Sequence, residues 1–555
     1  MKNAHFPQVK KVKPIGGFHG VSAVFPTLND IIDYEEKKVI INRGYPRFVT
    51  HPIVQKFEDF YKKKFNSQAV LCCQSFESAV FLVIEFYFKK GNRIFFDKGL
   101  PIDIFNYLNK KFPNIVTKSN PLEAEILIIN ISEFKPEIKL KNKILIGITN
   151  DSLIPLKDSD LDFNIIIKHD KQRDVGLIIF YNFDYLNLGL MRRHCGFIAS
   201  SRKICSSKNS TRFLKMKNEE ILKKQISKLE STSSNHCFLY PSGMAAIFSA
   251  LFTLFSSKKP KFIGLGSLYV DTIRILEKIP PKYNLNQVIF INKNFNQELL
   301  KHIDNNTAGI IFETPSNPLI QLVDIKNIIK IAHSRGTKVI IDNTIATPYN
   351  FNPFKYQADI IVHSTTKFLN GKNNHMGGVL LTKDAKIMKK INQFNELANL
   401  DMCFNDVRIL NKNITKFKAR MKAINANAEK VAKFLNEHRA IDKVYYPSLK
   451  NSADYKNKQL YLKGSSGLIS FVLKNSTLAR AKKFYNNVKK PLLKGPSLGS
   501  EKTLLSPYVM MAHYDDPKET LNRLGFDYYL MRLSVGIEPV EKIIKSLKFA
   551  LDPLI

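Results

Sequence analysis

The sequence lacks a long hydrophobic run. Its longest apolar stretch, Ala79–Phe88, is short and is interrupted by Glu85. A membrane-spanning helix needs about 20 consecutive, mostly apolar residues, so we expect no membrane span. The opening residues, MKNAHFPQVKKVKP, also lack the apolar core of a signal peptide. We therefore expect a protein that is neither inserted in a membrane nor exported.

Cysteine is scarce, and its spacing matches no redox or zinc motif. The six cysteines, which form no CxxC pair, are Cys72, Cys73, Cys195, Cys205, Cys237 and Cys403. Disulfide-rich proteins belong to oxidising compartments, and zinc sites use closely spaced cysteine pairs. This usage favours a reduced, cytoplasmic compartment and predicts no metal site.

Acidic residues are few. There are 48 Asp and Glu against 85 Lys and Arg, which gives a formal net charge of +37. Such an excess is typical of nucleic-acid-binding proteins when the charges gather in a patch. Here basic clusters such as KKVIINR are scattered and are not interleaved with aromatic residues. We favour a general bias toward lysine, with solvated side chains, and do not expect a nucleic-acid partner. A basic nucleic-acid-binding protein is the alternative outside the enzyme class.

The sequence does contain a strand–helix–strand pattern within residues 309–378. Runs at 310–312, 339–341 and 360–362 are rich in β-branched residues, as in strands buried on both faces. The apolar spacing over 325–333 predicts an amphipathic helix between the first two. This is a right-handed parallel crossover, and ligands gather beyond the carboxyl ends of such strands. The polar residues at those ends are Glu313, Thr314, Asn317, Asp342, Asn343, Thr344, His363, Ser364, Thr366 and Lys367.

Two of these strand-end residues suggest pyridoxal phosphate chemistry. A lysine at the end of a rigid strand, such as Lys367, can hold the cofactor aldehyde as a Schiff base. A carboxylate, such as Asp342 on the preceding strand end, can keep the pyridine nitrogen protonated. Ser364 and Thr366 carry hydroxyls that could bind the phosphate or orient the ring. The alternative is that these are the ordinary polar strand ends of an α/β domain.

Motifs around these residues resemble the Cys/Met-metabolism family of pyridoxal phosphate enzymes. They are ETPSNP, DNTIATPY, ADIIVHSTTKFLNG and the glycine pair at 377–378, and they occur in the family's order. The resemblance covers roughly residues 235–548, and it departs after the lysine, where members often have Gly-His and this chain has Gly371-Lys372. It implies pyridoxal 5′-phosphate as cofactor and small amino acids as substrates. The matching residues are Lys367 for the Schiff base, Asp342 for the pyridine nitrogen, Thr344 near the ring, Ser364 and Thr366 for the phosphate, Gly243 and Met244 for backbone contacts to the phosphate, Tyr269 stacked on the ring, and Ser497 and Arg532 for the substrate.

The resemblance also implies the fold and its division into domains. We expect an α/β fold of the aspartate-aminotransferase-like, pyridoxal phosphate-dependent transferase type, with a parallel-rich sheet. A length of 555 residues and a hydrophobic content of 44% fit two or three globular domains. We assign a cofactor-binding large domain to 196–401 and a small C-terminal α+β domain to 402–555. Residues 1–195 are expected to be a degenerate copy of the large domain.

The degenerate copy is inferred from repeated order. KNKILIGIT resembles GTKVIIDNT, and RRHCGFIASS resembles NNHMGGVLLT. Gly147 then stands opposite Asp342, and Gln172 or Arg173 opposite Lys367, so this copy cannot perform the chemistry. Its expected strands lie at 69–71, 93–96, 126–129, 144–146 and 165–167. Chance similarity between two α/β segments is the alternative.

The N-terminal part keeps one further family feature. GYPRFVTHP, at 44–52, resembles the Tyr-x-Arg segment that reaches the cofactor phosphate of a neighbouring subunit in the family. The resemblance implies that Tyr45 and Arg47 bind the phosphate. The corresponding region of the second half, ICSSKNSTRFLKMKN, has no such pair. The protein is therefore expected to be a homo-oligomer or an internal pseudo-dimer.

Within the family, two stretches narrow the expected reaction. YVDT and SLGSEKTLLSPYVMMAHY resemble the fungal-type, two-part cystathionine γ-synthases most. These enzymes of trans-sulfuration and methionine biosynthesis replace the γ-leaving group of an activated homoserine ester with cysteine. In that reaction Lys367 and Tyr269 are expected to transfer protons. The alternatives are a cystathionine β- or γ-lyase and an O-acylhomoserine sulfhydrylase.

Overall fold

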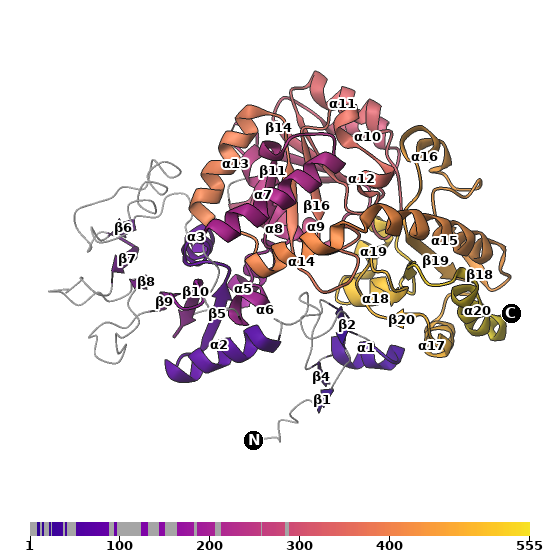
Figure 1. Cartoon of the computed structure of the whole chain (residues 1–555), viewed down its shortest axis with the longest axis horizontal. Helices are drawn as coiled ribbons and strands as arrows, with labels where there is room; N and C mark the ends of the chain where they lie inside the picture. The colour runs from indigo at the N-terminus through magenta and orange to yellow at the C-terminus, as the bar shows by residue number, and fades with distance from the viewer. Residues whose placement is uncertain are drawn as a thin grey trace.

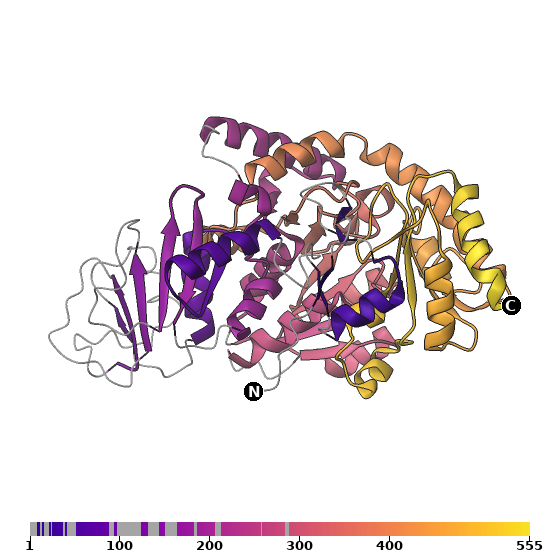
Figure 2. The same cartoon turned by 90° about the horizontal axis from the view of Figure 1, so that it is seen from below.

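The computed structural model of the chain describes most of the second half and discrete parts of the first. The described residues are 8–10, 14–15, 22–23, 25–36, 39–41, 52–87, 94–96, 124–130, 144–149, 164–181, 186–205, 212–256, 258–282 and 288–555. Three β-sheet units follow one another across the molecule in Figures 1 and 2: a smaller N-terminal sheet, a larger central sheet and a C-terminal sheet.

Seven strands form the larger sheet, in the order β11–β17–β16–β15–β14–β12–β13. Strands β12 to β16 are parallel, and β17 is antiparallel to both of its neighbours. The bounds are β11 Cys237–Tyr240, β12 Lys261–Leu265, β13 Val288–Ile291, β14 Thr307–Glu313, β15 Lys338–Asp342, β16 Ile360–Ser364 and β17 Gly378–Leu381. The three expected strands are confirmed as β14, β15 and β16, and the expected helix as α11 (Ile325–Ser334).

Helices cover both faces of this sheet, which explains its continuous apolar strands. On β14, Ile311 packs in one core cluster and its neighbour Ile310 in another, because successive side chains of a strand point to opposite faces. The helices are α8 Gly243–Leu254, α9 Val270–Lys282 and α13 Ala385–Ala398 on one face, and α7 Arg212–Leu229, α10 Phe295–His302, α11 and α14 Phe404–Ile414 on the other.

The smaller sheet has six strands in the order β5–β10–β9–β8–β7–β6. Strands β6 to β9 are parallel, and β10 is antiparallel to β9 and to β5. The bounds are β5 Ala69–Cys73, β6 Ile94–Phe96, β7 Ile126–Asn130, β8 Ile144–Thr149, β9 Ile165–Asp170 and β10 Val175–Phe180, so the five strands expected here are confirmed. The order and directions are those of the first six strands of the larger sheet.

Strand register corrects one correspondence drawn from the sequence. Gly176 and Gly378 take the same place, because an added Cβ would lie 2.3 Å and 2.1 Å, respectively, from the backbone carbonyl of a helix-capping serine. Counted from these glycines through the paired strands, Ile148 rather than Gly147 takes the position of Asp342. The residue is apolar, so the position carries no carboxylate.

The correspondence between RRHCGFIASS and NNHMGGVLLT is wrong. Residues 192–201 form the end of α5 (Leu186–His194), the turn after it and the start of α6 (Ser201–Cys205), because β10 already supplies the antiparallel strand. Gln172 and Arg173 lie in a tight turn, 171–174, between β9 and β10. The matching connection in the larger sheet is the much longer segment 365–377, which carries Lys367.

Aromatic side chains join the smaller sheet to the larger one. Helix α3 (Phe76–Tyr87) of the smaller sheet packs against α8 and α13 within a single hydrophobic cluster. Phe81 lies 6.2 Å from Phe248 and 5.6 Å from Phe394, ring centroid to ring centroid. Phe197 also contacts Phe248, at 5.4 Å. The two units therefore share one core.

The C-terminal unit is a five-stranded sheet in the order β18–β19–β22–β21–β20 with helices packed on it. Its main elements are α15 Phe417–Glu437, β18 Ile441–Tyr445, β19 Leu468–Leu473, α17 Leu478–Asn487, β20 Leu493–Lys494, β21 Leu504–Pro507, β22 Met531–Ser534 and α20 Val540–Leu551. Helix α14 precedes α15 in the chain and packs on the larger sheet. Helix α1 (Leu28–Glu35) packs on this unit, although it belongs to the N-terminal part of the chain.

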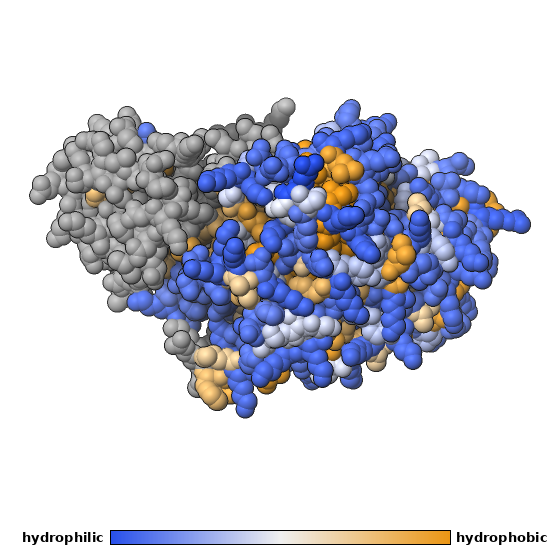
Figure 3. Space-filling view, turned by 90° about the horizontal axis from the view of Figure 1, so that it is seen from above, coloured by the Kyte–Doolittle hydropathy of each residue, from blue (hydrophilic) through white to orange (hydrophobic). Residues whose placement is uncertain are grey.

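The state of the cysteines and the distribution of hydrophilic residues over the surface are consistent with the composition. All six cysteines are free, and five of them are buried. Among the helices that the structure describes, none combines the length and apolarity needed to cross a membrane. On the face shown in Figure 3, hydrophilic residues are spread over the surface and apolar residues form small patches.

Candidate active site

A cavity lies where the carboxyl ends of the central strands meet the C-terminal unit. It brings together nine of the residues proposed from the sequence: Gly243, Met244, Tyr269, Asp342, Thr344, Ser364, Thr366, Lys367 and Arg532. These residues come from segments far apart in the sequence. Ser497 lies beside the cavity, between the lining residues Pro496 and Leu498. Tyr45 and Arg47 lie outside the described residues.

The start of α8 forms one wall. The Ser242 hydroxyl caps the helix by accepting a hydrogen bond from the Ala245 amide at 3.1 Å. Gly243 follows, and a Cβ there would lie 2.8 Å from Cβ of Ser364. Only glycine therefore allows the end of β16 to approach the helix N-terminus, where free amides and the helix dipole favour a phosphate group.

Lys367 lies just beyond β16, opposite the C-terminal unit. Its Nζ donates to Oγ of Ser497 at 3.3 Å. Gly499, two residues later, has φ +77° and would place a Cβ 2.8 Å from the Lys367 carbonyl carbon. The backbone of the C-terminal unit is thus packed directly on the lysine, which fixes where its side chain begins.

Asp342 and Glu313 stand side by side at the ends of β15 and β14. The Thr344 amide donates to Oδ1 of Asp342 at 2.9 Å, and Oγ1 of Thr344 accepts from the Ser364 amide at 2.7 Å. Burial raises the pKa of Asp342, although the hydrogen bonds from Thr344 and the charge of His363 oppose the shift. Burial and the neighbouring charge of Asp342 raise the pKa of Glu313 well above its usual range. The pKa of Glu313 is therefore the more strongly raised of the two.

Arg532 on β22 is buried and oriented from three sides. Its guanidinium donates to Oδ1 of Asn317 at 3.0 Å and to the Pro496 carbonyl. The guanidinium carbon lies 4.5 Å from the centre of the Tyr508 ring, and the Tyr508 hydroxyl accepts from the Asn317 amide at 3.2 Å. A guanidinium held in this way presents a planar fork that suits a carboxylate.

The lining residues that were not foreseen include Tyr508, Arg193 and Asp271. Tyr508 holds Arg532, and Arg193 of α5 pairs with Asp271 at 3.2 Å. Tyr508 and Asp271 lie in stretches that the sequence analysis quoted, SLGSEKTLLSPYVMMAHY and YVDT. Arg193 carries no local signal, because it reaches the cavity only through the packing of the smaller sheet on the larger one.

The corresponding end of the smaller sheet is built differently. Ser75 caps α3 by accepting from the Ser78 amide at 2.9 Å, as Ser242 caps α8. The next residue is Phe76 where α8 has Gly243, and its ring lies 5.6 Å from the His169 ring, centroid to centroid. Two rings therefore lie at the place where the larger sheet has Gly243 and Ser364.

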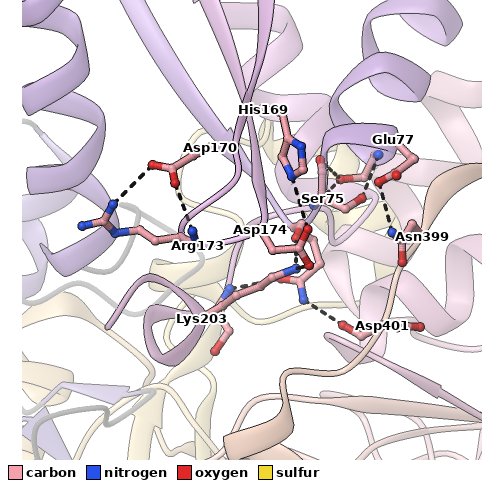
Figure 4. Close-up of polar contacts among 12 residues, drawn as sticks. Ser75, Glu77, His169, Asp170, Arg173, Asp174, Lys203, Asn399 and Asp401 are labelled. Atoms are coloured by element: carbon pink, nitrogen blue, oxygen red, sulfur yellow. Dashed lines mark hydrogen bonds and ion pairs between the residues drawn. The ribbon is translucent and has the colours of Figure 1, made fainter. Parts of the chain in front are cut away.

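Polar side chains close the rest of this end, as Figure 4 shows. Asp174 pairs with His169 at 3.2 Å and with Lys203 at 3.5 Å. Glu77 accepts a hydrogen bond from Asn399, at the end of α13, at 3.1 Å. The contact of Glu77 with Asn399 joins this end of the smaller sheet to the larger unit.

The residues of the central cavity fit pyridoxal phosphate. Asp342 has a raised pKa and no ion pair with a cation among the described residues, so it suits a protonated ring nitrogen. The helix N-terminus at Gly243 suits a phosphate, and Lys367, which lines the same cavity, suits the aldehyde. The fold and cavity are those of a pyridoxal phosphate-dependent enzyme with a mixed, parallel-rich sheet.

Comparisons with known proteins lead to the same class of enzyme. The chain belongs to the Cys/Met metabolism PLP-dependent enzyme family, whose profile matches residues 206–552. It is 32% identical over 315 residues to a cystathionine β-lyase of Lactococcus lactis, covering 57% of this chain and 81% of that protein. It is 34% identical over 328 residues to a cystathionine γ-synthase of Neurospora crassa, covering 57% and 51%. The structure of a cystathionine γ-lyase from Lactobacillus plantarum superposes with a TM-score of 0.56 at 27% identity, covering 61% of this chain and 86% of that one. The protein is thus a pyridoxal phosphate enzyme that acts on sulfur amino acids.

Proposed function

We propose that this protein is a cystathionine γ-synthase of the fungal, two-part type. Cysteine sulfur forms a bond to Cγ of an activated homoserine ester, the Cγ–O bond breaks, and the acid leaves. The observation that carries the proposal is the match to the Neurospora crassa γ-synthase, in which the aligned segment is only 51% of the protein. In both proteins a large part of the chain lies outside the aligned segment.

The roles of the cavity residues follow from their places. Pyridoxal phosphate, when bound, supplies an aldehyde for the substrate amine and a ring that accepts electrons. Lys367 would hold the aldehyde and would move a proton at Cα of the substrate. Asp342 keeps the ring nitrogen protonated, and Thr344 fixes Asp342. Tyr269 stacks on the ring and assists proton transfer.

Two further groups of residues position the reactants. Arg532 binds the substrate α-carboxylate, and Ser497 orients Lys367 through their hydrogen bond of 3.3 Å. The phosphate is held by Ser364, Thr366 and the backbone amides of Gly243 and Met244. All of these groups line or flank one cavity, so a small amino acid can contact the lysine and the arginine together.

A lyase is the second candidate. The match to the Lactococcus lactis cystathionine β-lyase spans 81% of that protein, which favours a shared site rather than a shared fragment. A lyase breaks a carbon–sulfur bond in cystathionine with nearly the same residues. An O-acylhomoserine sulfhydrylase differs from the proposed enzyme only in taking sulfide as nucleophile.

Product analysis separates the candidates. Purified protein is given acetyl-, succinyl- or phosphohomoserine, each with cysteine or with sulfide, and separately cystathionine alone. The proposal predicts cystathionine from cysteine and one of the esters, which also identifies the leaving group. Homocysteine formed faster from sulfide would indicate a sulfhydrylase. Keto acid and ammonia from cystathionine, without γ-replacement, would indicate a lyase.

We also propose that the smaller sheet, within residues 1–195, is a degenerate copy of the large domain. Shared strand order supports this, as do the matching glycines and capping serines. Phe81 and Phe248 each stand six residues after their capping serine, and they contact each other. Contact between equivalent positions is typical of a two-fold interface between like subunits. The chain would then be an internal pseudo-dimer in a cytoplasmic enzyme, with domains at 1–195, 196–401 and 402–555.

The proposal further assigns Tyr45 and Arg47, which lie outside the described residues, to the cofactor phosphate of the catalytic copy. Arg47→Ala should then weaken cofactor binding by about tenfold to a hundredfold, since a charge-assisted hydrogen bond is lost. The affinity of Arg47→Ala is compared with that of a chain starting near residue 200. A shortened chain that binds cofactor and turns over like the full protein would remove this role.

A further inference from the structure

The segment that carries Lys367 is held in place by side chains from other parts of the chain. Residues 365–377, all of which the structure describes, connect β16 to β17 without forming a helix or a strand. Just after the lysine, Arg420 of α15 donates to the carbonyls of Phe368 and Leu369 at 3.1 Å and 2.8 Å. One end of the segment is therefore fixed by the C-terminal unit.

Arg202 of α6 fixes the other end of the segment. One guanidinium nitrogen of Arg202 donates to the Asn374 carbonyl, and the other donates to Oδ1 of Asp406, on α14, at 2.7 Å. The same carboxylate oxygen accepts a hydrogen bond from the Met376 amide at 3.4 Å. The arginine and the aspartate thus hold the backbone at two nearby residues.

Asp406 is a buried carboxylate that is well supplied with partners. Burial alone would raise its pKa, but the hydrogen bond and charge of His375 and the charge of Arg202 lower the pKa below its usual range. Oγ of Ser200 also donates to Oδ2 of Asp406 at 2.7 Å. Arg202 is therefore held by an ionised group, and a buried ion pair with such additional hydrogen bonds is costly to break from one side.

Helix α6 is part of the core of the smaller sheet. Ile204 on this helix belongs to the same hydrophobic cluster as Val54 of α2 (Pro52–Lys64) and Leu177 of β10. Arg202 also lies before the segment that the family profile matches, residues 206–552. The smaller-sheet unit therefore places one of its own side chains on the backbone that carries the lysine.

Two hydrogen bonds connect this end of the segment to the lysine amine. Oδ1 of Asn373, the neighbour of Asn374, accepts from the Ser497 hydroxyl at 3.1 Å. The same hydroxyl oxygen accepts from Nζ of Lys367 at 3.3 Å. A shift of the backbone at 373–374 would therefore move the group on which the amine rests. A misplacement of about 1 Å at a reacting group can lower a rate by about a hundredfold.

We propose that Arg202 is a positioning residue for Lys367, so that the smaller-sheet unit fixes the lysine of the catalytic unit in the same chain. Arg202 acts through the Asn374 carbonyl and through Asp406. The proposal rests on the assignment of Lys367 to the cofactor aldehyde and not on which sulfur amino acid reacts. Because Arg202 also lines the cavity, it is tested without substrate.

The test uses the full-length protein after removal of the cofactor. Amide hydrogen exchange is measured over residues 365–377. Pyridoxal phosphate is then added, and the rate at which a borohydride-reducible adduct forms on Lys367 is followed by mass spectrometry. The variants are Arg202→Lys and Arg202→Ala, and thermal unfolding checks that each is folded.

Arg192→Lys is the matched control. Arg192 is a buried arginine of α5 that likewise pairs with one carboxylate, that of Glu58, and donates to one carbonyl, that of Cys72 at 2.8 Å. Both of these partners belong to the smaller-sheet unit. Lysine keeps the charge at either position and loses the planar fork, so the two substitutions should destabilise the protein to a similar degree.

Arg202→Lys should raise hydrogen exchange over 365–377 by about tenfold and slow adduct formation by about tenfold, because the segment loses one of its hydrogen bonds. Arg202→Ala should have the larger effect in both measurements. Arg192→Lys should leave both within about twofold of the wild type. Wild-type exchange and adduct formation in folded Arg202→Lys would overturn the proposal. Equal changes in Arg192→Lys would also overturn it, because they would show a general loss of stability.

Two further results keep the test decisive. If neither Arg202 variant folds, Asn373→Ala removes the acceptor that links the segment to Ser497, and adduct formation at the wild-type rate in that variant would overturn the proposal. A wild-type adduct on a lysine other than Lys367 would overturn both the assignment of Lys367 and the role of Arg202. Amide exchange is measured without cofactor or substrate, so it tests the contact of Arg202 with the segment whichever reaction the enzyme catalyses.

Discussion

Replacing Asp342 with asparagine tests which of the two carboxyls at the strand ends, Asp342 or Glu313, carries the negative charge beside the ring nitrogen. Asp342 and Glu313 are neighbours in register, and both line the cavity. Burial and the charge of Asp342 raise the pKa of Glu313 well above its usual range, so we expect Glu313 to be the neutral partner. Asp342 is then the group that can place a negative charge beside a protonated ring nitrogen.

The magnitude follows from removing that charge. A nearby opposite charge shifts a pKa by about 1–3 units, and each unit corresponds to about 1.4 kcal/mol. In Asp342→Asn the pKa of the ring nitrogen should fall by this amount, so its protonated fraction at about pH 8 drops, with about tenfold to a thousandfold as the upper limit. Turnover should fall in proportion. Acidification restores the protonated form, so the remaining activity of the variant should rise from about pH 8 to about pH 6.

The assay is steady-state kinetics against pH with cofactor at saturation. Glu313→Gln is the matched control, and its pH profile should stay close to that of the wild type because no charge is removed. Turnover of Asp342→Asn within about twofold of wild type at about pH 8 would refute the role of Asp342. A Glu313→Gln profile shifted as far as that of Asp342→Asn would show that the charge belongs to the other carboxyl.

Three other outcomes are expected. Lys367→Ala should form no covalent adduct between a lysine and the cofactor that borohydride can reduce, whereas Lys372→Ala, at an exposed neighbouring position, should form it normally. Mass spectrometry of the reduced protein detects the adduct, and an adduct on another lysine in Lys367→Ala would contradict the assignment. Arg532→Lys should raise KM for the amino-acid substrate by about tenfold to a hundredfold with a smaller change in kcat, because the bidentate fork is lost; unchanged KM would exclude it as the carboxylate ligand. Phe81→Ala should lower the free energy of unfolding by about 3–5 kcal/mol, because its ring is buried between the two large units. As a control, Phe60→Ala should cost less than about 0.5 kcal/mol, because Phe60 is 59% exposed. Denaturant unfolding compares the two variants, and equal effects would mean that the shared core is not stabilising.

Local sequence pattern was enough to predict the strands and the chemistry at their ends. Runs of β-branched residues favour strands that are buried on both faces of a sheet. The positions of β14, β15 and β16 could therefore be predicted from these runs alone. Lys367 and Asp342 directly follow or end such strands. Because parallel strands share one carboxyl edge, their side chains had to meet at one place.

Register and contacts between distant segments required the tertiary structure. KNKILIGIT aligns by letter with GTKVIIDNT, yet hydrogen bonding between strands shifts the match by one residue and places Ile148 opposite Asp342. The place of Tyr508 beside Arg532 depends on how the C-terminal unit closes on the cavity. Arg193 reaches the cavity because Phe81 and Phe197 pack on Phe248 and bring α5 against α8. Packing between units depends on whole surfaces, so no short motif around Arg193 could predict that this residue lines the cavity.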